Sequence, residues 1–460
     1  MVKIGLEVHI PLNKLQTKLF CSCKLPKIDS EPNSHCCHVC LGHPGSKPVL
    51  NKTAVENALK LALSLGFEIA DEAIFSRKTY FYPDMTKNYQ ITQYEIPLGQ
   101  KGSLVLDSGK KVNLKRIHLE EDPGALIHPS GMQSSQYVLI DYNRAGIPLV
   151  EVVSDPDMTS PEEAREFLNK LIQRVNYLNI YDSKDATIKA DANISVEGGA
   201  RIEIKNISGF KEISKALTYE LEVQKKEKSK EQQTKAWDPE QELTFKLRSK
   251  ETEEDYGYIF DPDLSIIELQ PLIKKVEKEI PELAHQKVQR YIKIYKIPKE
   301  DAETIASELF LAELFEKIAT KIDPILAAKW LRRELLRVLN YNKKELSEME
   351  IDGQHLIDLL TLVKEKKITE QTAQKIMEKL IEKPFDIKSY VEKNKLALVS
   401  SENELEVICK KILKGNEKVL QDYKNGEEKA FNYLVGQVMK ETRGRASPQV
   451  VNALMKKLIK

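Results

Sequence analysis

Residues 191–205 have the sequence Asp-Ala-Asn-Ile-Ser-Val-Glu-Gly-Gly-Ala-Arg-Ile-Glu-Ile-Lys, and they decide how the first half of this chain folds. Polar and apolar residues alternate on both sides of Gly198 and Gly199. A period of two is the pattern of a β-strand with one buried face. A glycine pair between two such segments favours a tight turn. We therefore expect an antiparallel hairpin with one apolar and one polar face.

The segment Ile4-Gly-Leu-Glu-Val-His-Ile10 shows the same alternation. Glu7 and His9 lie on one side of this expected strand, and the apolar residues lie on the other. On the hairpin, the polar side carries Asp191, Asn193, Ser195, Arg201, Glu203 and Lys205. Alternating charge is most often the solvated side of a sheet, and for each segment taken alone that interpretation stays open.

Residues 116–120, Arg-Ile-His-Leu-Glu, form a third such segment. Its polar residues share one side, and this parity pairs Glu120 rather than Glu121 with His118. Histidine, asparagine and paired carboxylates are unusual on a merely solvated face. The chain also has no P-loop and no Gly-rich dinucleotide motif. The three segments together favour a site where carboxylates hold Mg²⁺ and basic side chains neutralise phosphate.

Residues 77–84, Arg-Lys-Thr-Tyr-Phe-Tyr-Pro-Asp, combine basic and aromatic side chains, and Lys87, Tyr89 and Gln93 follow them. Such interleaving suits the stacking of a nucleobase or of a terminal adenosine. Aromatic runs are more often part of a core, so the pattern alone is weak. A later segment adds two more polar candidates for the same pocket, Arg248 and Lys250.

Five of the six cysteines lie between Cys21 and Cys40, and no secretory signal precedes them. Such a cluster points to a metal rather than to disulfides. Two close pairs joined by a loop supply the corners that tetrahedral zinc needs, which predicts the ligands Cys21, Cys23, Cys37 and Cys40. Four protein ligands leave no open position, so the zinc would be structural. Cys36, His35 and His38 are spare candidates, and buried free thiols remain the alternative.

Composition describes a globular chain with a balanced charge. Its 460 residues carry 71 Lys+Arg against 70 Asp+Glu, a formal net charge of +1, so we expect no DNA binding and only local basic patches. No apolar stretch is long enough to cross a bilayer, and we expect no membrane association. With no secretory signal pattern, the expected compartment is the cytoplasm.

The periodicity changes along the chain and predicts three parts. Residues 1–278 alternate in short segments, which indicates an α+β domain built on an antiparallel sheet. Residues 279–398 have long helical periodicity, and Asp323 followed by Pro324 marks one helix start. Residues 399–460 form a small helical tail.

Taken together, these segments resemble the GatB/GatE family, the B-type subunits of tRNA-dependent amidotransferases, over nearly the whole chain. The ordered motifs that carry the likeness are Ile4-Gly-Leu-Glu-Val-His, Phe20-Cys-Ser-Cys, Val39-Cys-Leu-Gly, Tyr80-Phe-Tyr-Pro-Asp, His118-Leu-Glu-Glu-Asp, Asp141-Tyr-Asn-Arg-Ala-Gly-Ile-Pro-Leu, Asp191-Ala-Asn-Ile-Ser-Val, Arg248-Ser-Lys-Glu and Leu434-Val-Gly-Gln-Val-Met-Lys.

The resemblance implies a cradle-shaped catalytic domain, an all-α helical domain and a YqeY-like tail. It implies an ATP-dependent ligase that phosphorylates the side-chain carboxylate of mischarged Asp-tRNA(Asn) or Glu-tRNA(Gln) and amidates it with ammonia. The expected partners are an amidase-like A subunit, which releases the ammonia, a small C subunit, and the mischarged tRNA.

Residue roles follow from the resemblance together with the strand parity. Glu7, His9 and Glu120 are the expected Mg²⁺ ligands and, with Lys205 as phosphate neutraliser, the expected catalytic residues. The ATP and acceptor pocket is expected to be lined by Tyr80, Tyr82, Asp191, Asn193, Ser195, Glu203, Arg248 and Lys250. In the tail, we expect tRNA backbone contacts from Lys440, Arg443 and Arg445.

Two alternatives stay open. GatE, the sister of GatB, acts on glutamyl-tRNA only and normally carries an inserted domain between cradle and helices. This chain runs from Asp261-Pro-Asp263 directly into helices, which favours GatB. The other alternative is a non-catalytic, zinc-stabilised tRNA-binding adaptor, which would turn over no ATP.

Overall fold

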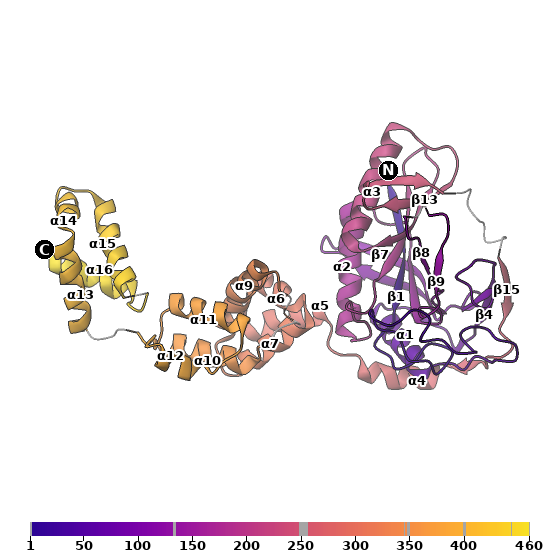
Figure 1. The fold of residues 1–460 in the computed structure, drawn as a ribbon, viewed down its shortest axis with the longest axis horizontal. Coiled ribbons are helices and arrows are strands. Elements are labelled where there is room, and N and C mark those ends of the chain that lie inside the picture. The colour runs from indigo at the N-terminus through magenta and orange to yellow at the C-terminus, as the bar shows by residue number, and fades with distance from the viewer. Residues whose placement is uncertain are drawn as a thin grey trace. The chain divides into compact units, whose positions relative to one another are not determined.

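The fold has two compact units, Met1–Leu283 and Ala284–Lys460. The computed structural model describes residues 2–131, 135–247, 256–344, 346, 350–398, 402–442 and 444–459. The first unit mixes sheets with helices and the second is helical (Figure 1), which confirms the α+β class. The predicted three-part division at residues 278 and 398 stays a prediction. Among the described residues, no helix combines the length and apolar character that crossing a bilayer requires.

A nine-stranded sheet organises the first unit, in the order β14-β13-β12-β11-β1-β10-β7-β6-β2. Neighbouring strands are antiparallel except for β12 and β13, which are parallel. The strands are β1 (Lys3–Pro11), β2 (Glu68–Ile69), β6 (Gly99–Val105), β7 (Lys111–Glu121), β10 (Pro148–Ser154), β11 (Lys189–Ser195), β12 (Ile202–Ser208), β13 (Gln233–Asp238) and β14 (Leu243–Lys246).

The hairpin predicted in residues 191–205 is confirmed as β11 and β12. Asn193 pairs with Glu203 and Ile194 pairs with Ile202 across the two strands. The two isoleucines have no exposed surface. The apolar side of the hairpin therefore belongs to the core, as its alternation requires.

Among the described residues, the helices that pack against this sheet lie on one face of it. These are α2 (Pro161–Tyr177), which packs against β1, and α3 (Phe210–Lys226), which packs against α2, β11 and β12 (Figure 1). Helix α1 (Lys52–Ser64) contacts β7 and α2. The covered face carries the apolar side chains of β1, among them Leu6 and Val8, which are buried. Because side chains alternate along a strand, the polar side chains of the same strands lie on the opposite face.

Three small sheets complete the first unit, and one of them borders the site. It consists of β4 (Ser76–Thr79), β5 (Tyr89–Thr92) and β15 (Gly257–Phe260). From the end of β5, the Thr92 hydroxyl donates a hydrogen bond to Glu120 on β7 at 3.1 Å. The other two pairs are β3 (Glu72–Ala73) with β16 (Ile267–Glu268), and β8 (Ala125–Ile127) with β9 (Leu139–Asp141). Helix α4 (Gln270–Val276) and the short turn Glu277–Glu279 end the unit.

Side-chain caps begin several of the helices, and one of them is the predicted start at Asp323. Ser160 caps α2 by accepting a hydrogen bond from the Glu163 amide, and Pro161 is its first residue. Asp323 caps α8 in the same way through the Leu326 amide. These caps satisfy amide groups that a helix leaves without an intrahelical partner.

The second unit is a succession of short helices. They are α5 (Ala284–Arg290), a π-helical segment Tyr291–Tyr295, α6 (Lys299–Ala306), α7 (Leu309–Ala319), α8 (Pro324–Trp330), a second π-helical segment Leu331–Leu335, α9 (Leu336–Asn342), α10 (Gly353–Lys364), α11 (Glu370–Glu382), α12 (Ile387–Lys393), α13 (Glu402–Gly415), α14 (Glu417–Lys424), α15 (Glu428–Glu441) and α16 (Pro448–Ile459). The last four share a core of their own that includes Leu405, Leu434 and Met455.

Substituting Phe167 tests whether the packing of α2 stabilises the sheet. Phe167 has no exposed surface, so Phe167→Ala leaves a cavity and is expected to lower the free energy of unfolding by about 3–5 kcal/mol. Urea unfolding measures the change in the free energy of unfolding, and amide hydrogen exchange shows whether β1 loses protection. Asn169→Ala, on the exposed side of the same helix, is the control and should stay within about 0.5 kcal/mol. Equal effects of the two variants would contradict this packing.

Candidate active site and metal centre

Five adjacent strands of the large sheet place the predicted polar residues on one face. Strand register puts Glu7 directly opposite Asp191, and His9 opposite Glu151. Glu151 in turn lies opposite His118 on β7. Directly opposed residues in antiparallel strands point to the same side of the sheet. The result is a continuous row of carboxylates and imidazoles across β12, β11, β1, β10 and β7.

The first group in this row joins imidazoles to carboxylates. His9 Nε2 lies 3.2 Å from Glu151 Oε2 and 3.9 Å from Glu120 Oε1. His118 Nε2 lies 3.4 Å from Glu120 Oε2 and 3.7 Å from Glu151 Oε2. One ligand atom each from His9, Glu120 and Glu151 fall within 4.8 Å of one another. This donor set fits a divalent cation, because carboxylate oxygens are what Mg²⁺ prefers.

The second group lies on the neighbouring strands and is acidic. Ligand atoms of Glu7, Asp191 and Glu203 fall within 4.8 Å of one another. Lys205 Nζ lies 3.2 Å from Asp191 and 3.0 Å from Glu203, so an ammonium group already neutralises part of this cluster. The Asn193 side-chain amide donates to Glu7 at 3.1 Å.

The charges of the two groups shift each other's pKa. Burial, together with the charges of Glu151 and Asp191, raises the pKa of Glu7. Burial lowers the pKa of His9, but its hydrogen bond to Glu151 and the surrounding carboxylates outweigh burial and raise the value to about 10. For Lys205, burial opposes the ammonium form, yet Asp191 and Glu203 raise its pKa. Protons held at His9 and Glu7 therefore compensate part of the negative charge of this face, and a divalent cation bound there would displace them.

A rim of cationic and aromatic side chains, formed by Lys78, Tyr80 and Tyr256, lies on one side of the first group. Burial raises the pKa of Glu151, but the charges of His118 and His9, and to a smaller extent that of Lys78, hold it below its usual value. Tyr80 packs edge-on against Tyr256, with ring centroids 5.7 Å apart, and the Lys78 ammonium lies 5.9 Å from the Tyr80 ring. Burial, and then nearby carboxylates that include Glu120, raise the pKa of Tyr80. Tyr80 therefore borders the imidazole–carboxylate group.

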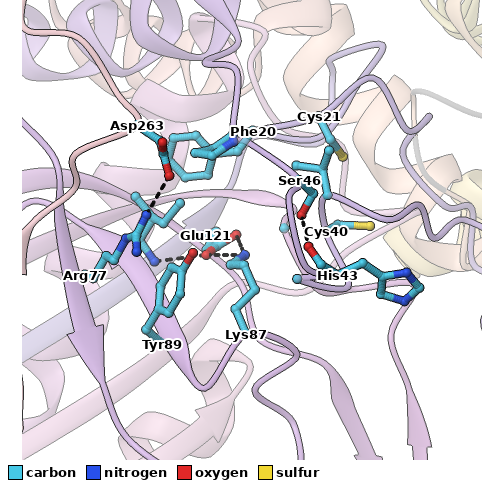
Figure 2. A pocket seen from close by; sticks show the side chains of 15 residues that line it. Phe20, Cys21, Cys40, His43, Ser46, Arg77, Lys87, Tyr89, Glu121 and Asp263 are labelled. Atoms are coloured by element: carbon cyan, nitrogen blue, oxygen red, sulfur yellow. Dashed lines mark hydrogen bonds and ion pairs between the residues drawn. The ribbon is translucent and has the colours of Figure 1, made fainter.

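The other face of β7 borders a pocket of about 180 Å³ (Figure 2). Glu121 points into it and pairs with Lys87 at 2.7 Å, so Glu120 and Glu121 serve different sides of the strand. Arg77 lines the same pocket and contacts Asp263 at 3.0 Å. Its guanidinium lies over the Tyr89 ring, 4.6 Å from the centroid. The parity argument that separated Glu120 from Glu121 is confirmed by these contacts.

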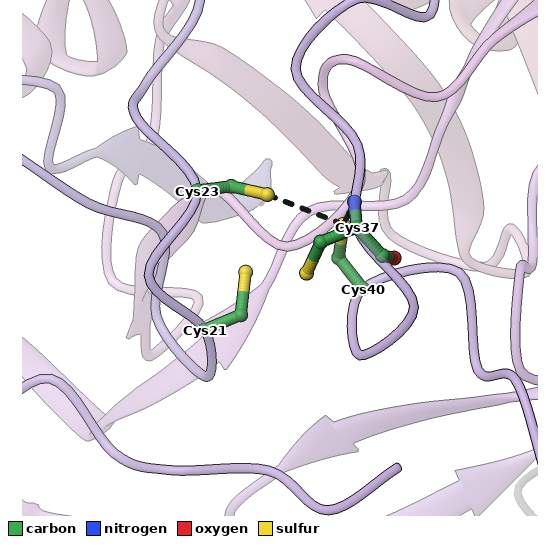
Figure 3. A group of neighbouring side chains, drawn as sticks. All are labelled: Cys21, Cys23, Cys37 and Cys40. Carbon is green, nitrogen blue, oxygen red and sulfur yellow. Dashed lines mark hydrogen bonds between the residues drawn. The ribbon is translucent and has the colours of Figure 1, made fainter.

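The four predicted cysteines gather at one point (Figure 3). Their sulfur atoms lie within 4.8 Å of one another, and Cys23 Sγ is 4.0 Å from Cys40 Sγ. None forms a disulfide. The hydrogen bond with Cys21 lowers the pKa of Cys40 to about 4, although burial opposes this shift. Four converging sulfurs, one of them disposed to be a thiolate, fit a tetrahedral zinc ion.

Cys36 does not join this group. Its sulfur lies 3.9 Å from the Asn143 side-chain oxygen. The spare candidate His35 is also engaged elsewhere, since its Nδ1 lies 3.0 Å from the Ser34 hydroxyl. The geometry therefore places Cys37, and not its neighbour Cys36, in the group of four cysteines.

Comparison with known proteins agrees with the motifs. Residues 2–275 match the family described as the GatB/GatE catalytic domain, and residues 313–459 match the one described as the GatB domain. The chain belongs to the GatB/GatE family.

Curated relatives of this GatB/GatE chain extend over its full length. A protein of Methanospirillum hungatei JF-1 is 42% identical over 99% of this chain and 98% of its own. One of Sulfolobus acidocaldarius is 42% identical over 99% of both chains, and one of Thermoanaerobacter pseudethanolicus is 41% identical over 98% of both. All three are named as the B subunit of an aspartyl/glutamyl-tRNA(Asn/Gln) amidotransferase.

The structure divides the Mg²⁺ ligands predicted for this family member between the two groups. His9 and Glu120 lie together, whereas Glu7 lies with Asp191 and Glu203. The third member of the first group is Glu151, which was not among the site residues predicted from the sequence. Its signal was present: Glu151 is the one charged residue of strand β10, which is otherwise apolar except for Ser154. The roles of these residues stay predictions.

The remaining predicted residues lie in several places. Ser195 is at the end of β11, opposite Lys3 and away from the two groups, and Tyr82 is half exposed. Lys440 is exposed near the end of α15. Arg445 donates to the main-chain oxygens of Thr442 and Lys395. Outside the described residues are Arg248, Lys250 and Arg443.

Paired serine variants test the cysteine centre. Cys37→Ser should lower the zinc content of the purified chain sharply, because it removes one of four converging sulfurs. Cys36→Ser, one residue away, should keep the wild-type content, because its sulfur faces Asn143. Zinc per chain is measured by plasma mass spectrometry. Loss of zinc from the Cys36 variant alone would reverse the ligand assignment.

Proposed function

We propose that this chain is the tRNA-binding, ATP-using subunit that converts mischarged Asp-tRNA(Asn), Glu-tRNA(Gln) or both into the amidated forms. The observation that carries the proposal is the row of imidazole, carboxylate and ammonium groups across five strands, in a chain that belongs to the GatB/GatE family. The names of its full-length relatives support the substrate class.

The chemistry explains why a cation-binding face is needed. A carboxylate is a poor electrophile, so the γ-phosphoryl group of ATP is first transferred to its oxygen, giving ADP and an acyl phosphate. Ammonia then attacks the acyl carbon and the bond to phosphate breaks. The nitrogen gives up one proton, which the departing phosphate takes up, so that an amide and inorganic phosphate remain. Phosphoryl transfer depends on positioning and on neutralising negative charge.

The first group is the proposed holder of Mg²⁺. His9, Glu120 and Glu151 supply the ligand atoms, with Glu7 on the adjoining acidic group. When bound there, the ion supplies charge neutralisation for the transferred phosphoryl group. Lys205, held between two carboxylates, is the proposed neutraliser of a further phosphate oxygen.

The rim supplies the proposed contacts to adenosine and to the acceptor end of the tRNA. Tyr80 borders the first group. Tyr82, two residues further along the chain, is half exposed, which leaves the Tyr82 ring available for stacking. Asp191, Asn193 and Glu203 line the same face. The proposed role of the zinc is structural, since four cysteine ligands leave no open position.

The proposed assembly includes an amidase-like A subunit, which supplies ammonia, and a small C subunit, all in the cytoplasm. The GatE alternative lacks support from the structure. After Asp263, the described residues lead through β16 into α4 without room for an inserted domain. The names of the relatives also specify the B-type protein.

Removing Glu120 tests the catalytic proposal. Glu120→Ala deletes a carboxylate from the proposed Mg²⁺ group and should lower tRNA-dependent ATP turnover by at least about 100-fold. Binding of the mischarged tRNA should change little. The assay combines the chain with its two proposed partner subunits, ATP and each mischarged tRNA in turn.

Glu68→Ala, which removes an exposed carboxylate at the edge of the same sheet, is the matched control and should turn over ATP like the wild type. Near-normal turnover by the Glu120 variant would end the Mg²⁺ assignment. No ATP turnover by the wild-type assembly with any mischarged tRNA would favour the non-catalytic adaptor.

A lysine variant and a truncation test the proposed tail contact. Removing residues 401–460 should weaken tRNA binding while the first unit stays folded. Lys440→Gln, at an exposed position, should weaken binding and reduce the salt-dependence slope by about 1. Lys424→Gln, exposed on another tail helix, is the control. Filter binding across a salt series measures the affinity for tRNA and its salt dependence for each protein. Unchanged affinity after truncation would exclude the tail from tRNA recognition.

A further inference from the structure

A fully buried lysine lies beside the cysteine centre. Lys18 has no exposed surface. Its Nζ lies 3.7 Å from Cys40 Sγ and 3.4 Å from the Tyr142 carbonyl oxygen. The Lys18 amide also donates to the carbonyl of Cys23 at 2.9 Å. One residue therefore contacts both halves of the centre, the Cys21–Cys23 half through its main chain and the Cys37–Cys40 half through its side chain.

The burial of Lys18 requires a counter-charge. A buried ammonium is stable only when it is paired and hydrogen-bonded. Within the described part of the chain, no carboxylate lies within ion-pair distance of the Lys18 Nζ. The acceptors that its ammonium reaches there are the Cys40 sulfur and a neutral carbonyl.

The state of the cysteine centre decides whether that counter-charge exists. Without a metal, Cys40 is the cysteine of the four whose pKa is lowered, and a neutral thiol offers an ammonium only a weak acceptor. Four thiolates around one Zn²⁺ carry a net charge of about −2, which a buried ammonium at hydrogen-bond distance compensates in part. The position of Lys18 thus fits a metal-loaded centre better than four buried thiols.

We propose that Lys18 is the counter-cation of a tetrathiolate zinc centre and, through its N–H···S hydrogen bond to Cys40, sets how firmly the metal is retained. It is a positioning residue and not a ligand. The inference rests on the proposal that the four cysteines bind zinc, and it is independent of the amidation reaction.

Lys18→Met tests the role, because methionine fills a similar apolar volume without the charge or the donor. Loss of such an outer partner weakens metal binding by about 10- to 100-fold, so zinc should transfer to a chromogenic chelator faster from the variant by a factor in that range. Lys24→Met, exposed in the same cysteine loop, is the control and should release zinc at the wild-type rate. Equal rates for all three proteins would overturn the role of Lys18.

A second measurement uses only the wild-type chain, in case the variant does not fold. Amine labelling followed by mass spectrometry should modify Lys24 in both zinc-loaded and chelator-stripped protein. Lys18 should be protected when zinc is present and become reactive once it is removed, because the cysteine loops that bury it are then no longer held together by the metal. Equal protection of Lys18 in both states would overturn the proposal, and absence of zinc from the purified wild type would overturn the zinc centre itself.

Discussion

The pairing of β1 with β10 on one side and β11 on the other brings together the two polar groups of the candidate site. Glu7 lies opposite Asp191 and His9 opposite Glu151 only in this register. Because side chains alternate along a strand, a slip of one residue would turn the imidazole and carboxylates into the apolar layer under α2 and α3. The buried residues Leu6 and Val8 prevent that slip. Core packing therefore sets the geometry of the site.

Strand parity could be derived from the sequence, but strand order could not. Alternation alone placed Glu120 with His118 and separated Glu121, and the contacts of both carboxylates agree. Local pattern carries no information about which distant strand lies beside β1. The insertion of β1 between β10 and β11 brings Glu151 to His9, and that pairing joins residues more than a hundred positions apart. This is why Glu151 was missed and the predicted Mg²⁺ ligands were drawn from two groups.

The same limit applies to the cysteine centre. Spacing identified two close pairs and left the neighbouring thiols Cys36 and Cys37 as competitors. The direction of the backbone within the loop decides between them. The Cys37 amide donates to Cys40 Sγ at 3.1 Å, and the side chain of Cys37 points toward the other sulfurs. Cys36 instead faces Asn143, a residue far along the chain. Only the three-dimensional path of the loop supplies that information.

The cysteine centre and the polar face are connected through one short segment. The Thr86 hydroxyl donates to the Cys40 carbonyl at 2.7 Å, and the next residue, Lys87, pairs with Glu121 on β7. Glu120, the neighbour of Glu121, faces the imidazole–carboxylate group on the other side of that strand. A structural metal that fixes Cys40 would thereby fix the strand that presents Glu120. With four cysteine ligands the proposed zinc would offer no reactive position, so the contribution that we propose for this centre is the placement of β7.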